Sequence, residues 1–377
     1  MELTLATPML GGLSPDDFMR RHWQKKPLLM RGAVPDAGVI VTRAQLFALA
    51  SREAVESRLV ERGVAGWRLR HGPFGRAALP PLKQAAWSLL VQGVDLHLSS
   101  ARALLERFRF VPDARLDDVM VSYASEGGGV GPHVDSYDVF LLQVQGRRRW
   151  RIGRVTDPTL LPGVPLKILA AFEPEQEWLL EPGDMLYLPP GWGHDGVAEG
   201  ECLTGSIGFR AAGREQLARE VLQRALDGCE QIDNDPLYRD PKQPATDAPG
   251  RIPAALQAFA AVAVARTLAA PRWLGCALGE VLSEPKPGVW FETATRLIGE
   301  GGVVLDRRSR MLYDDWHVFI NGESFRAAGR DATLMRRLAD QRLLSARERA
   351  ALSLPARELL DDWIAAGWIL TDLELAP

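Results

Sequence analysis

The spacing of hydrophobic and polar positions changes twice along the chain. Before about residue 117, helix signals are the most frequent. Ser14 to Asp17 reads SPDD, which is typical of a helix N-terminus, and Thr42 and Gln45 have the spacing of a capping box. After the break at Pro80-Pro81, the run over 82–94 predicts one more helix. We therefore expect short helices in the first hundred residues.

From about Asp117 onward, short β-rich runs alternate with glycine and proline clusters. The runs cover residues 119–123, 139–144, 150–152, 185–188 and 203–209. Many short strands with such turn signals are typical of a small all-β barrel or sandwich. The middle of the chain is therefore expected to form a β-rich core.

The pattern becomes helical again after about residue 211. Helices are expected over 214–226 and 253–269, with a turn-rich segment over 233–249 between them. The proline-bearing stretch at 283–288 reads as a linker. Beyond it, short strands at 310–313 and 316–320, a turn at Asn321-Gly322 and helices at 333–340, 346–352 and 356–366 suit a winged-helix-like fold.

These changes predict three domains, at 1–212, 213–282 and 283–377. The overall fold class is α+β. The helical stretch 212–275 has apolar faces that suit a dimer seam, although packing within one chain explains the same pattern.

Composition narrows the class of protein. The chain has 377 residues, 46% of them hydrophobic, and a formal net charge of -3, so it can bury a core and has no bulk attraction for nucleic acid. Arginines in the last hundred residues are interleaved with acids, which argues against DNA binding there. Three cysteines without CxxC spacing argue against disulfides and a thiolate zinc site. With no membrane span and no basic leader, we expect a cytoplasmic protein.

The most informative motif is an H-x-D tripeptide followed by a distant histidine. His133 and Asp135 are two residues apart, so an extended strand points both toward one face. His194 ends a second block, GDMLYLPPGWGH, that begins at Gly183. The tripeptide alone is common by chance, but the two blocks together have suitable strand contexts. Two histidines and one carboxylate leave open metal positions, as in non-haem Fe(II) oxygenases.

Both blocks resemble one protein family. The run GGGVGPHVDSYDVFLLQVQGRRRWRIG with EPGDMLYLPPGWGHDG is similar to the JmjC-type 2-oxoglutarate oxygenases, and within them to the bacterial ribosomal oxygenases. RRHWQKKPLLMRG and GSIGFRA also resemble that subfamily. The resemblance implies a double-stranded β-helix (cupin jelly-roll) core, a helical dimerisation region and a winged-helix domain. It also implies Fe(II) held by His133, Asp135 and His194, with 2-oxoglutarate and O2 as cosubstrates.

The far carboxylate of 2-oxoglutarate needs a cation, and strand alternation selects one from the run RRRWRI. Arg148 shares a face with Trp150 and Ile152, whereas Arg147, Arg149 and Arg151 share the other. Arg148 also matches the family's basic position, and a guanidinium can grip a carboxylate with two hydrogen bonds. Ser122 is a second candidate contact. The other arginines are expected on a solvated face.

The resemblance further implies the substrate, an arginine of a large-subunit ribosomal protein that is hydroxylated at Cβ. Asp118, Met120, Tyr137 and Ser206 match the positions that form the family's substrate pocket. An acid and an aromatic face suit a cationic, planar side chain. Two alternatives stay open: hydroxylation of a histidine in a ribosomal protein, and a cupin-type metal-binding protein without oxygenase activity. The homodimer rests on the resemblance alone.

Overall fold

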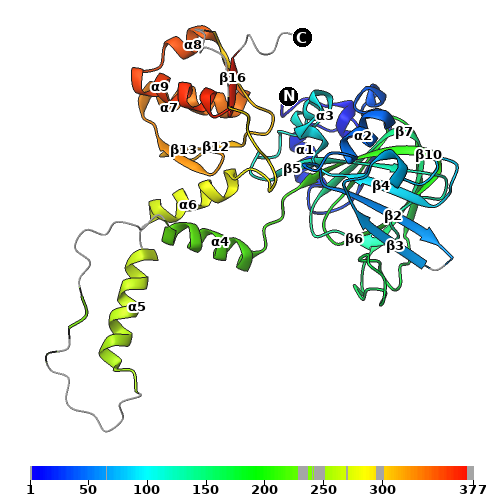
Figure 1. Cartoon of the computed structure of the whole chain (residues 1–377), viewed down its shortest axis with the longest axis horizontal. Helices are drawn as coiled ribbons and strands as arrows, with labels where there is room; N and C mark the ends of the chain where they lie inside the picture. Colours follow the sequence, from blue (N-terminus) through cyan, green and yellow to red (C-terminus); the bar gives the residue numbers. More distant parts are fainter. Residues whose placement is uncertain are drawn as a thin grey trace. The chain divides into compact units, whose positions relative to one another are not determined.

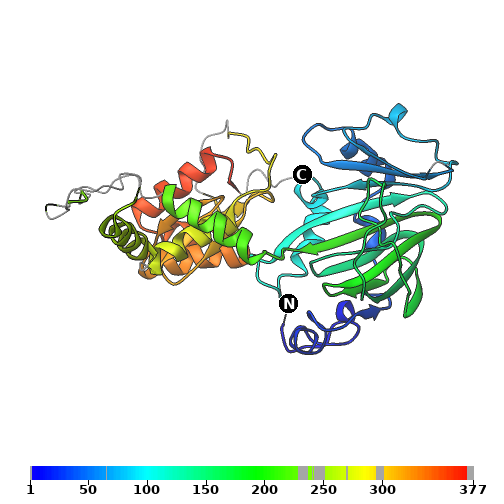
Figure 2. The same ribbon diagram turned by 90° about the horizontal axis from the view of Figure 1, so that it is seen from below.

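The computed structural model describes residues 2–64, 66–227, 237–239, 241, 251–268, 271–293 and 301–371. The chain forms two compact units, Met1–Ala211 and Ala212–Pro377 (Figures 1 and 2). The finer division of the second unit at 282/283 stays a prediction. Most of the turn-rich segment expected over 233–249 lies outside the described residues.

The first unit contains short helices, and α1 and α2 among them carry the two expected caps. They are η1 Pro8–Leu10, α1 Pro15–Arg21, η2 Ala37–Val39, α2 Arg43–Ala50, η3 Arg76–Ala78, η4 Val94–Leu96 and α3 Ser99–Glu106. The Ser14 side chain accepts a hydrogen bond from the Asp17 N–H, and Thr42 and Gln45 form a complete capping box. Both predicted helix starts are confirmed.

A ten-stranded antiparallel sheet forms the rest of the first unit. Its strands are β1 Leu28–Met30, β2 Ser57–Gly63, β3 Gly66–His71, β4 Trp87–Val91, β5 Leu116–Ala124, β6 His133–Val134, β7 Val139–Arg154, β8 Gln176–Leu180, β9 Met185–Leu188 and β10 Trp192–Phe209. The main order is β1-β9-β7-β10-β5-β4-β2-β3, while β6 pairs with β10 and β8 pairs with β7. β7 and β10 pair with each other along most of their length. Both side strands are attached to this central pair.

The run over 82–94 is not the helix that we predicted. It contains β4, which pairs with β2 and β5, and four of its five residues are buried. Trp87, Leu89 and Val91 all have 0% exposure, so burial between two neighbouring strands outweighs the local helix signal. A short apolar run does not by itself distinguish a buried strand from a helix.

The runs at 139–144 and 150–152, expected as separate strands, belong to the single strand β7. Opposite Gln143–Arg147 the register with β10 is irregular, and Gly146 has a φ of +66°. The irregularity exchanges the faces of the strand: Val139 and Leu141 share a core cluster with Trp150 and Ile152, although their sequence parity differs. A β-bulge produces this kind of switch.

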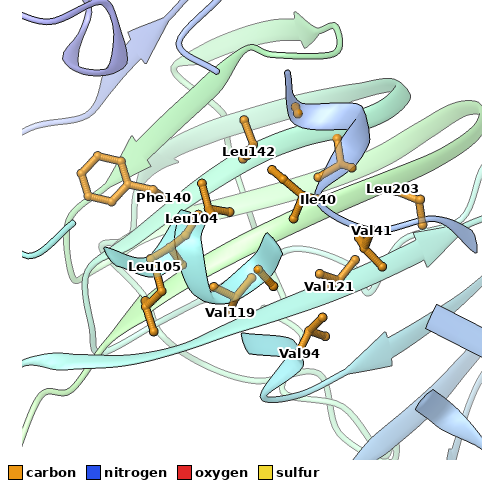
Figure 3. Packing of buried hydrophobic residues seen from close by; sticks show 14 of the residues in the cluster. Ile40, Val41, Val94, Leu104, Leu105, Val119, Val121, Phe140, Leu142 and Leu203 are labelled. Atoms are coloured by element: carbon orange, nitrogen blue, oxygen red, sulfur yellow. The ribbon is translucent and has the colours of Figure 1, made fainter. Parts of the chain in front are cut away.

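The larger hydrophobic core lies between the sheet and the short helices. Side chains of α3 and η4 pack against those of β5 and β7 (Figure 3). Alternation along β5 places Val119, Val121 and Tyr123 in this core. The opposite face of the same strand therefore carries Asp118, Met120 and Ser122.

The segment before β1 is tied to the sheet by a buried carboxylate. Asp138 accepts hydrogen bonds from the Tyr187 hydroxyl (2.6 Å) and the Gln24 side-chain amide (3.0 Å), and it also pairs with Arg115. β1 then pairs with β9, in the register Leu28 to Tyr187. These contacts give the RRHWQKKPLLMRG segment a structural role.

The second unit contains helices and two small sheets. Its elements are α4 Arg214–Asp227, α5 Ala254–Leu268, α6 Pro271–Ser283, β11 Val303–Leu305, β12 Met311–Tyr313, β13 His317–Ile320, β14 Glu323–Arg326, α7 Gly329–Gln341, β15 Leu343–Leu344, α8 Ala346–Ala350, α9 Leu354–Ala365 and β16 Ile369–Thr371. The sheets have the orders β15-β11-β16 and β12-β13-β14. Asn321-Gly322 forms the predicted turn, with φ values of +51° and +90°. Helices α7 and α9 contribute Met335, Leu338 and Trp363 to one core with these strands.

Candidate functional site

Two strands and the residue after one of them bring the H-x-D…H side chains together. His133 lies on β6 directly opposite His194 on β10, and their ring centroids are 4.2 Å apart. Asp135 follows β6, and one of its carboxylate oxygens lies 3.6 Å from His194 Nε2. The candidate ligand atoms of the three residues all lie within 4.8 Å of one another. Among the described residues, this is the one such group of three or more metal-ligating side chains.

Backbone carbonyls orient both imidazoles. His133 Nδ1 lies 2.9 Å from the Gly131 oxygen, and His194 Nδ1 lies 3.2 Å from the Trp192 oxygen. A hydrogen bond from each Nδ1–H leaves the Nε2 lone pair free for a metal, and this second interaction is typical of metal-binding histidines. Two imidazoles and a carboxylate are a donor set that suits Fe(II). The residues present therefore fit the Fe(II) that the sequence resemblance implies.

Burial sets the protonation of the cluster. His194 is 2% exposed, and burial followed by the nearby charge of His133 holds its pKa well below the usual range. A neutral imidazole is the form that binds a metal. Burial raises the pKa of Asp135, an effect opposed by the charge of His133 and a hydrogen bond from Tyr137. A bound cation would favour the ionised carboxylate.

A glycine-rich loop approaches the cluster closely. Gly131, whose oxygen contacts His133, has a φ of +80°, a conformation that disfavours residues with a side chain. A Cβ at that position would also lie 3.0 Å from Ile168. The loop thus permits the backbone to turn closely beside the site.

Arg148 faces inward, as strand alternation predicted. It is 4% exposed and shares its face with Trp150, with its guanidinium carbon 5.0 Å from the centre of that ring. Its Nη2 donates a hydrogen bond of 3.1 Å to the oxygen of Gly196, two residues from His194 on β10. The positive charge is thus held close to the candidate metal cluster.

The partners of Arg148 are neutral groups. Nη1 donates to the hydroxyls of Ser122 (3.2 Å) and Thr204 (3.4 Å), while the buried Nε finds no hydrogen-bond partner. Within the described part of the chain, no carboxylate lies within the 4 Å of an ion pair with Arg148. Burial accordingly lowers the pKa of this guanidinium. An interior cation without a counter-charge is costly and fits an anionic ligand.

The neighbouring arginines lie on the other face of the strand. Arg149 pairs with Glu177 and Glu199, and Arg151 pairs with Asp195. Arg147 is exposed. The predicted solvated face is confirmed for these residues.

The four predicted substrate contacts occupy two places. Asp118 and Met120 share the face of β5 that carries Ser122, and Ser206 on β10 is the register partner of Met120. Asp118 is 2% exposed and accepts hydrogen bonds from the Gln92 amide (2.8 Å) and the Gly93 N–H (2.9 Å). Tyr137 is 40% exposed and hydrogen-bonds Asp135, and burial of its hydroxyl with the charges of Asp135 and Asp118 raises its pKa. Their contact with substrate stays a prediction.

Sequence reasoning missed two residues beside Arg148. A Cβ on Gly196 would lie 2.6 Å from the Trp150 ring and 2.7 Å from Arg148 Nε, so only glycine fits there. Gly196 shares the strand parity of His194, which was an available signal. Thr204 contacts Arg148 through cross-strand register, and local spacing carries no signal for that contact.

Two family matches cover separate parts of the chain. The JmjC domain family matches residues 103–217, and the ROXA-like winged helix family matches residues 266–369. The fold and the candidate metal cluster therefore define a JmjC-type oxygenase domain, followed by a winged helix.

Curated relatives carry related names. The chain is 40% identical over 233 residues to the ribosomal protein uL16 3-hydroxylase of Escherichia coli, with 60% of each chain covered. It is 37% identical over 203 residues to the probable ribosomal oxygenase of Haemophilus influenzae, covering 52% of this chain and 50% of that protein. These alignments thus span between half and two thirds of the curated relatives.

Solved structures extend the similarity to nearly the whole chain. The crystal structure of Escherichia coli ribosomal oxygenase YcfD superposes with a TM-score of 0.81 at 30% identity, covering 96% of this chain and 98% of that one. A YcfD structure in complex with cobalt and 2-oxoglutarate has a TM-score of 0.80 with the same identity and coverage. The chain belongs to the JmjC-type ribosomal oxygenase family.

Among the residues that the structure describes, no helix has the length and hydrophobicity needed to cross a lipid bilayer.

Proposed function

We propose that this protein is an Fe(II)- and 2-oxoglutarate-dependent oxygenase that hydroxylates the Cβ of an arginine in a large-subunit ribosomal protein. The observation that carries the proposal is Arg148, a buried cation without a described carboxylate partner that reaches toward the strand of His194. A small dicarboxylate that contacts a metal at one end and Arg148 at the other satisfies both groups. Ser122 would line the same subsite.

When bound, Fe(II) supplies O2 activation coupled to decarboxylation: 2-oxoglutarate and O2 become succinate and CO2, and one oxygen atom enters the substrate C–H bond. The protein's own groups bind and orient the reactants. His133, Asp135 and His194 would hold the metal through three ligand atoms and leave positions for the cosubstrates. Arg148 would orient 2-oxoglutarate, and the row of Asp118, Met120 and Ser206 would hold the substrate side chain.

An arginine substrate is favoured over histidine by the buried acid Asp118 on this row, since a guanidinium prefers an ionised partner. The E. coli relative is named for ribosomal protein uL16, so peptides of uL16 are the first substrates to test. A ribosomal protein as substrate would also place the reaction in the cytoplasm.

The test is an incubation of Fe(II)-loaded protein with 2-oxoglutarate and peptides that cover each arginine of uL16. Tandem mass spectrometry locates an added oxygen atom, and NMR of the product assigns the carbon. We expect hydroxylation at the arginine Cβ by the wild type and by Arg149→Ala, and none by His133→Ala or Arg148→Ala. Arg149 is the matched control because it is the next residue on the same strand and faces the other way.

Other outcomes would change the proposal in defined ways. Oxygen on a histidine would support the histidyl hydroxylase alternative. Turnover of 2-oxoglutarate to succinate without peptide modification would keep the oxygenase and reject the substrate. If the wild type neither binds nor consumes 2-oxoglutarate, the protein is a cupin-type metal-binding protein without oxygenase activity.

We also propose that the helical region 213–282 forms a homodimer contact, distinct from the winged-helix region 283–377. Apolar side chains lie exposed on α4 and α5, including Leu226 at 58%, Val262 at 50% and Val264 at 59%. Leu226→Glu with Val262→Glu should convert a dimer to a monomer in sedimentation experiments. Leu354→Glu, on another exposed apolar position, is the control. A monomeric wild type would reject the dimer.

A further inference from the structure

The interior around Arg148 contains a chain of polar side chains that substrate and metal binding do not explain. Thr204 is 1% exposed and Gln143 is 0% exposed, yet neither was a candidate for any role. We infer that Thr204 and Gln143 are positioning residues that aim the Arg148 guanidinium at the far carboxylate of 2-oxoglutarate. The inference rests on the proposed function.

The direction of each hydrogen bond follows from Gln143. Its Nε2 donates to the backbone oxygens of Gln145 (2.9 Å) and Gly146 (3.4 Å), so both of its N–H groups have acceptors. Its Oε1 therefore faces Thr204, whose hydroxyl donates to it over 3.1 Å. Because the amide oxygen can only accept, the Thr204 hydroxyl donates its proton to Gln143, and the buried Cys202 thiol lies within hydrogen-bonding reach of both side chains. The Thr204 oxygen then offers only lone pairs to Arg148.

Ser122 is constrained in the same way. Its hydroxyl donates to the backbone oxygen of Thr204 at 3.5 Å, so it also presents lone pairs to Arg148 Nη1. The two hydroxyls occupy both Nη1 hydrogens, and the Gly196 oxygen accepts from Nη2. Of the five guanidinium N–H groups, this leaves the Nε–H and one Nη2–H. The Nε–H and the remaining Nη2–H can still donate to a carboxylate.

The bulge in β7 makes this arrangement available. At the irregular register Gln145 is still paired with Leu203, Gly146 has no register partner on β10, and the backbone oxygens of both accept from the Gln143 side chain. The same irregularity exchanges the strand faces, so Gln143 and Arg148, of opposite sequence parity, both reach Thr204. The bulge in β7 thus positions both Gln143 and Arg148, which lie on either side of Thr204 in this series of hydrogen bonds.

The donor and acceptor directions of these hydrogen bonds predict which substitutions weaken 2-oxoglutarate binding. Thr204→Val preserves shape but removes the acceptor for Arg148, whereas Thr204→Ser retains it. Gln143→Leu leaves the Thr204 hydroxyl without its acceptor, so its proton can turn toward Arg148 and oppose the cation. Each of these substitutions removes one buried hydrogen bond that helps to orient Arg148. Such a loss corresponds to a decrease of about fivefold in the affinity for 2-oxoglutarate.

The experiment measures 2-oxoglutarate binding to the Co(II)-loaded full-length protein by calorimetry without O2, so that no turnover is needed. We expect Thr204→Val and Gln143→Leu to weaken binding about fivefold and Thr204→Ser to bind as the wild type does. In turnover, KM for 2-oxoglutarate should rise while kcat at saturation changes less than twofold, because the metal ligands are untouched. Thr371→Val, a buried threonine of the second unit, is the matched control.

The double variant tests whether Gln143 acts through Thr204. In the Thr204→Val background, Gln143→Leu should cause no further loss of affinity, because the intermediate hydroxyl is already absent. Additive losses, or a loss shared equally by Thr204→Ser, would overturn the inference, and so would unchanged affinity in Thr204→Val. If the wild type does not bind 2-oxoglutarate, the proposed function has failed instead. Melting temperatures of all variants separate misfolding from a change in affinity.

Discussion

His133 and His194 face each other across β6 and β10, although sixty residues of sequence lie between the two histidines. Each imidazole is held by a backbone oxygen two residues before it, that of Gly131 in the glycine-rich loop or that of Trp192 on β10. Because the ring orientations are fixed before any metal arrives, little rearrangement is needed for binding.

Loss of one metal ligand should therefore be severe. Loss of an outer-shell partner alone typically weakens metal binding about 10–100-fold, so we expect His194→Ala to weaken Co(II) binding by more than about 100-fold. Hydroxylation should fall to background. Titration of the visible Co(II) bands measures the affinity. His71→Ala, which removes an exposed histidine of β3, should bind as the wild type does; equal losses in both variants would contradict this site.

The buried charge of Arg148 should lower the free energy of unfolding, although the proposed binding of 2-oxoglutarate requires it. Replacement by methionine fills a similar volume and removes a buried charge without a described counter-charge, so Arg148→Met should raise the free energy of unfolding by about 1 kcal/mol or more. That gain corresponds to an increase in Tm of about 2–4 °C for a domain of this size. Binding of 2-oxoglutarate should be lost. A destabilised variant, measured by thermal unfolding without ligand, would show that the guanidinium's neutral hydrogen bonds outweigh its desolvation.

Gly196→Ala should disturb the same pocket through contact alone. The added methyl group would overlap the Trp150 ring and Arg148 Nε, at 2.6 and 2.7 Å. We expect at least tenfold weaker 2-oxoglutarate binding and destabilisation by about 1–3 kcal/mol, the range for overpacking. Gly38→Ala is the control, since an added Cβ there meets nothing within 4 Å. Unchanged affinity in Gly196→Ala would mean that Arg148 does not depend on this approach.

Asp118→Asn tests the preference for arginine. The amide oxygen can still accept from the Gly93 N–H, so the fold should be retained while the negative charge is lost. We expect KM for an arginine-containing peptide to rise about tenfold, within the range for losing a charged hydrogen bond, with KM for 2-oxoglutarate unchanged. Steady-state kinetics with each substrate varied in turn make the comparison. An unchanged peptide KM would place Asp118 in a purely structural role toward Gln92 and Gly93.

Much of the candidate site can be read from sequence because its signals are local. His133 and Asp135 are two residues apart, and the inward face of Arg148 follows from its parity with Trp150 and Ile152. Both relations lie within one segment that stays extended. The helix caps at Ser14 and Thr42 were predicted for the same reason, since each cap depends on three or four neighbouring residues.

Other features depend on contacts between distant segments. The segment over 82–94 contains the strand β4 because β2 and β5 lie on both sides of it, and the spacing of the segment carries no sign of either neighbour. Thr204 contacts Arg148 only because a bulge changes the register of β7 against β10. A bulge exchanges the faces of a strand, so alternation cannot be extended through it.

Through the short strand β1, the first thirty residues also protect an edge of the sheet. β1 covers β9, whose four residues are all buried, and among the described strands β7 is the other partner of β9. A chain that lacked β1 would present the free backbone N–H and C=O groups of an apolar strand to solvent, which is the usual template for edge-to-edge aggregation. The N-terminal segment is far in sequence from the candidate metal ligands. It therefore protects the sheet that holds those ligands from edge-to-edge aggregation.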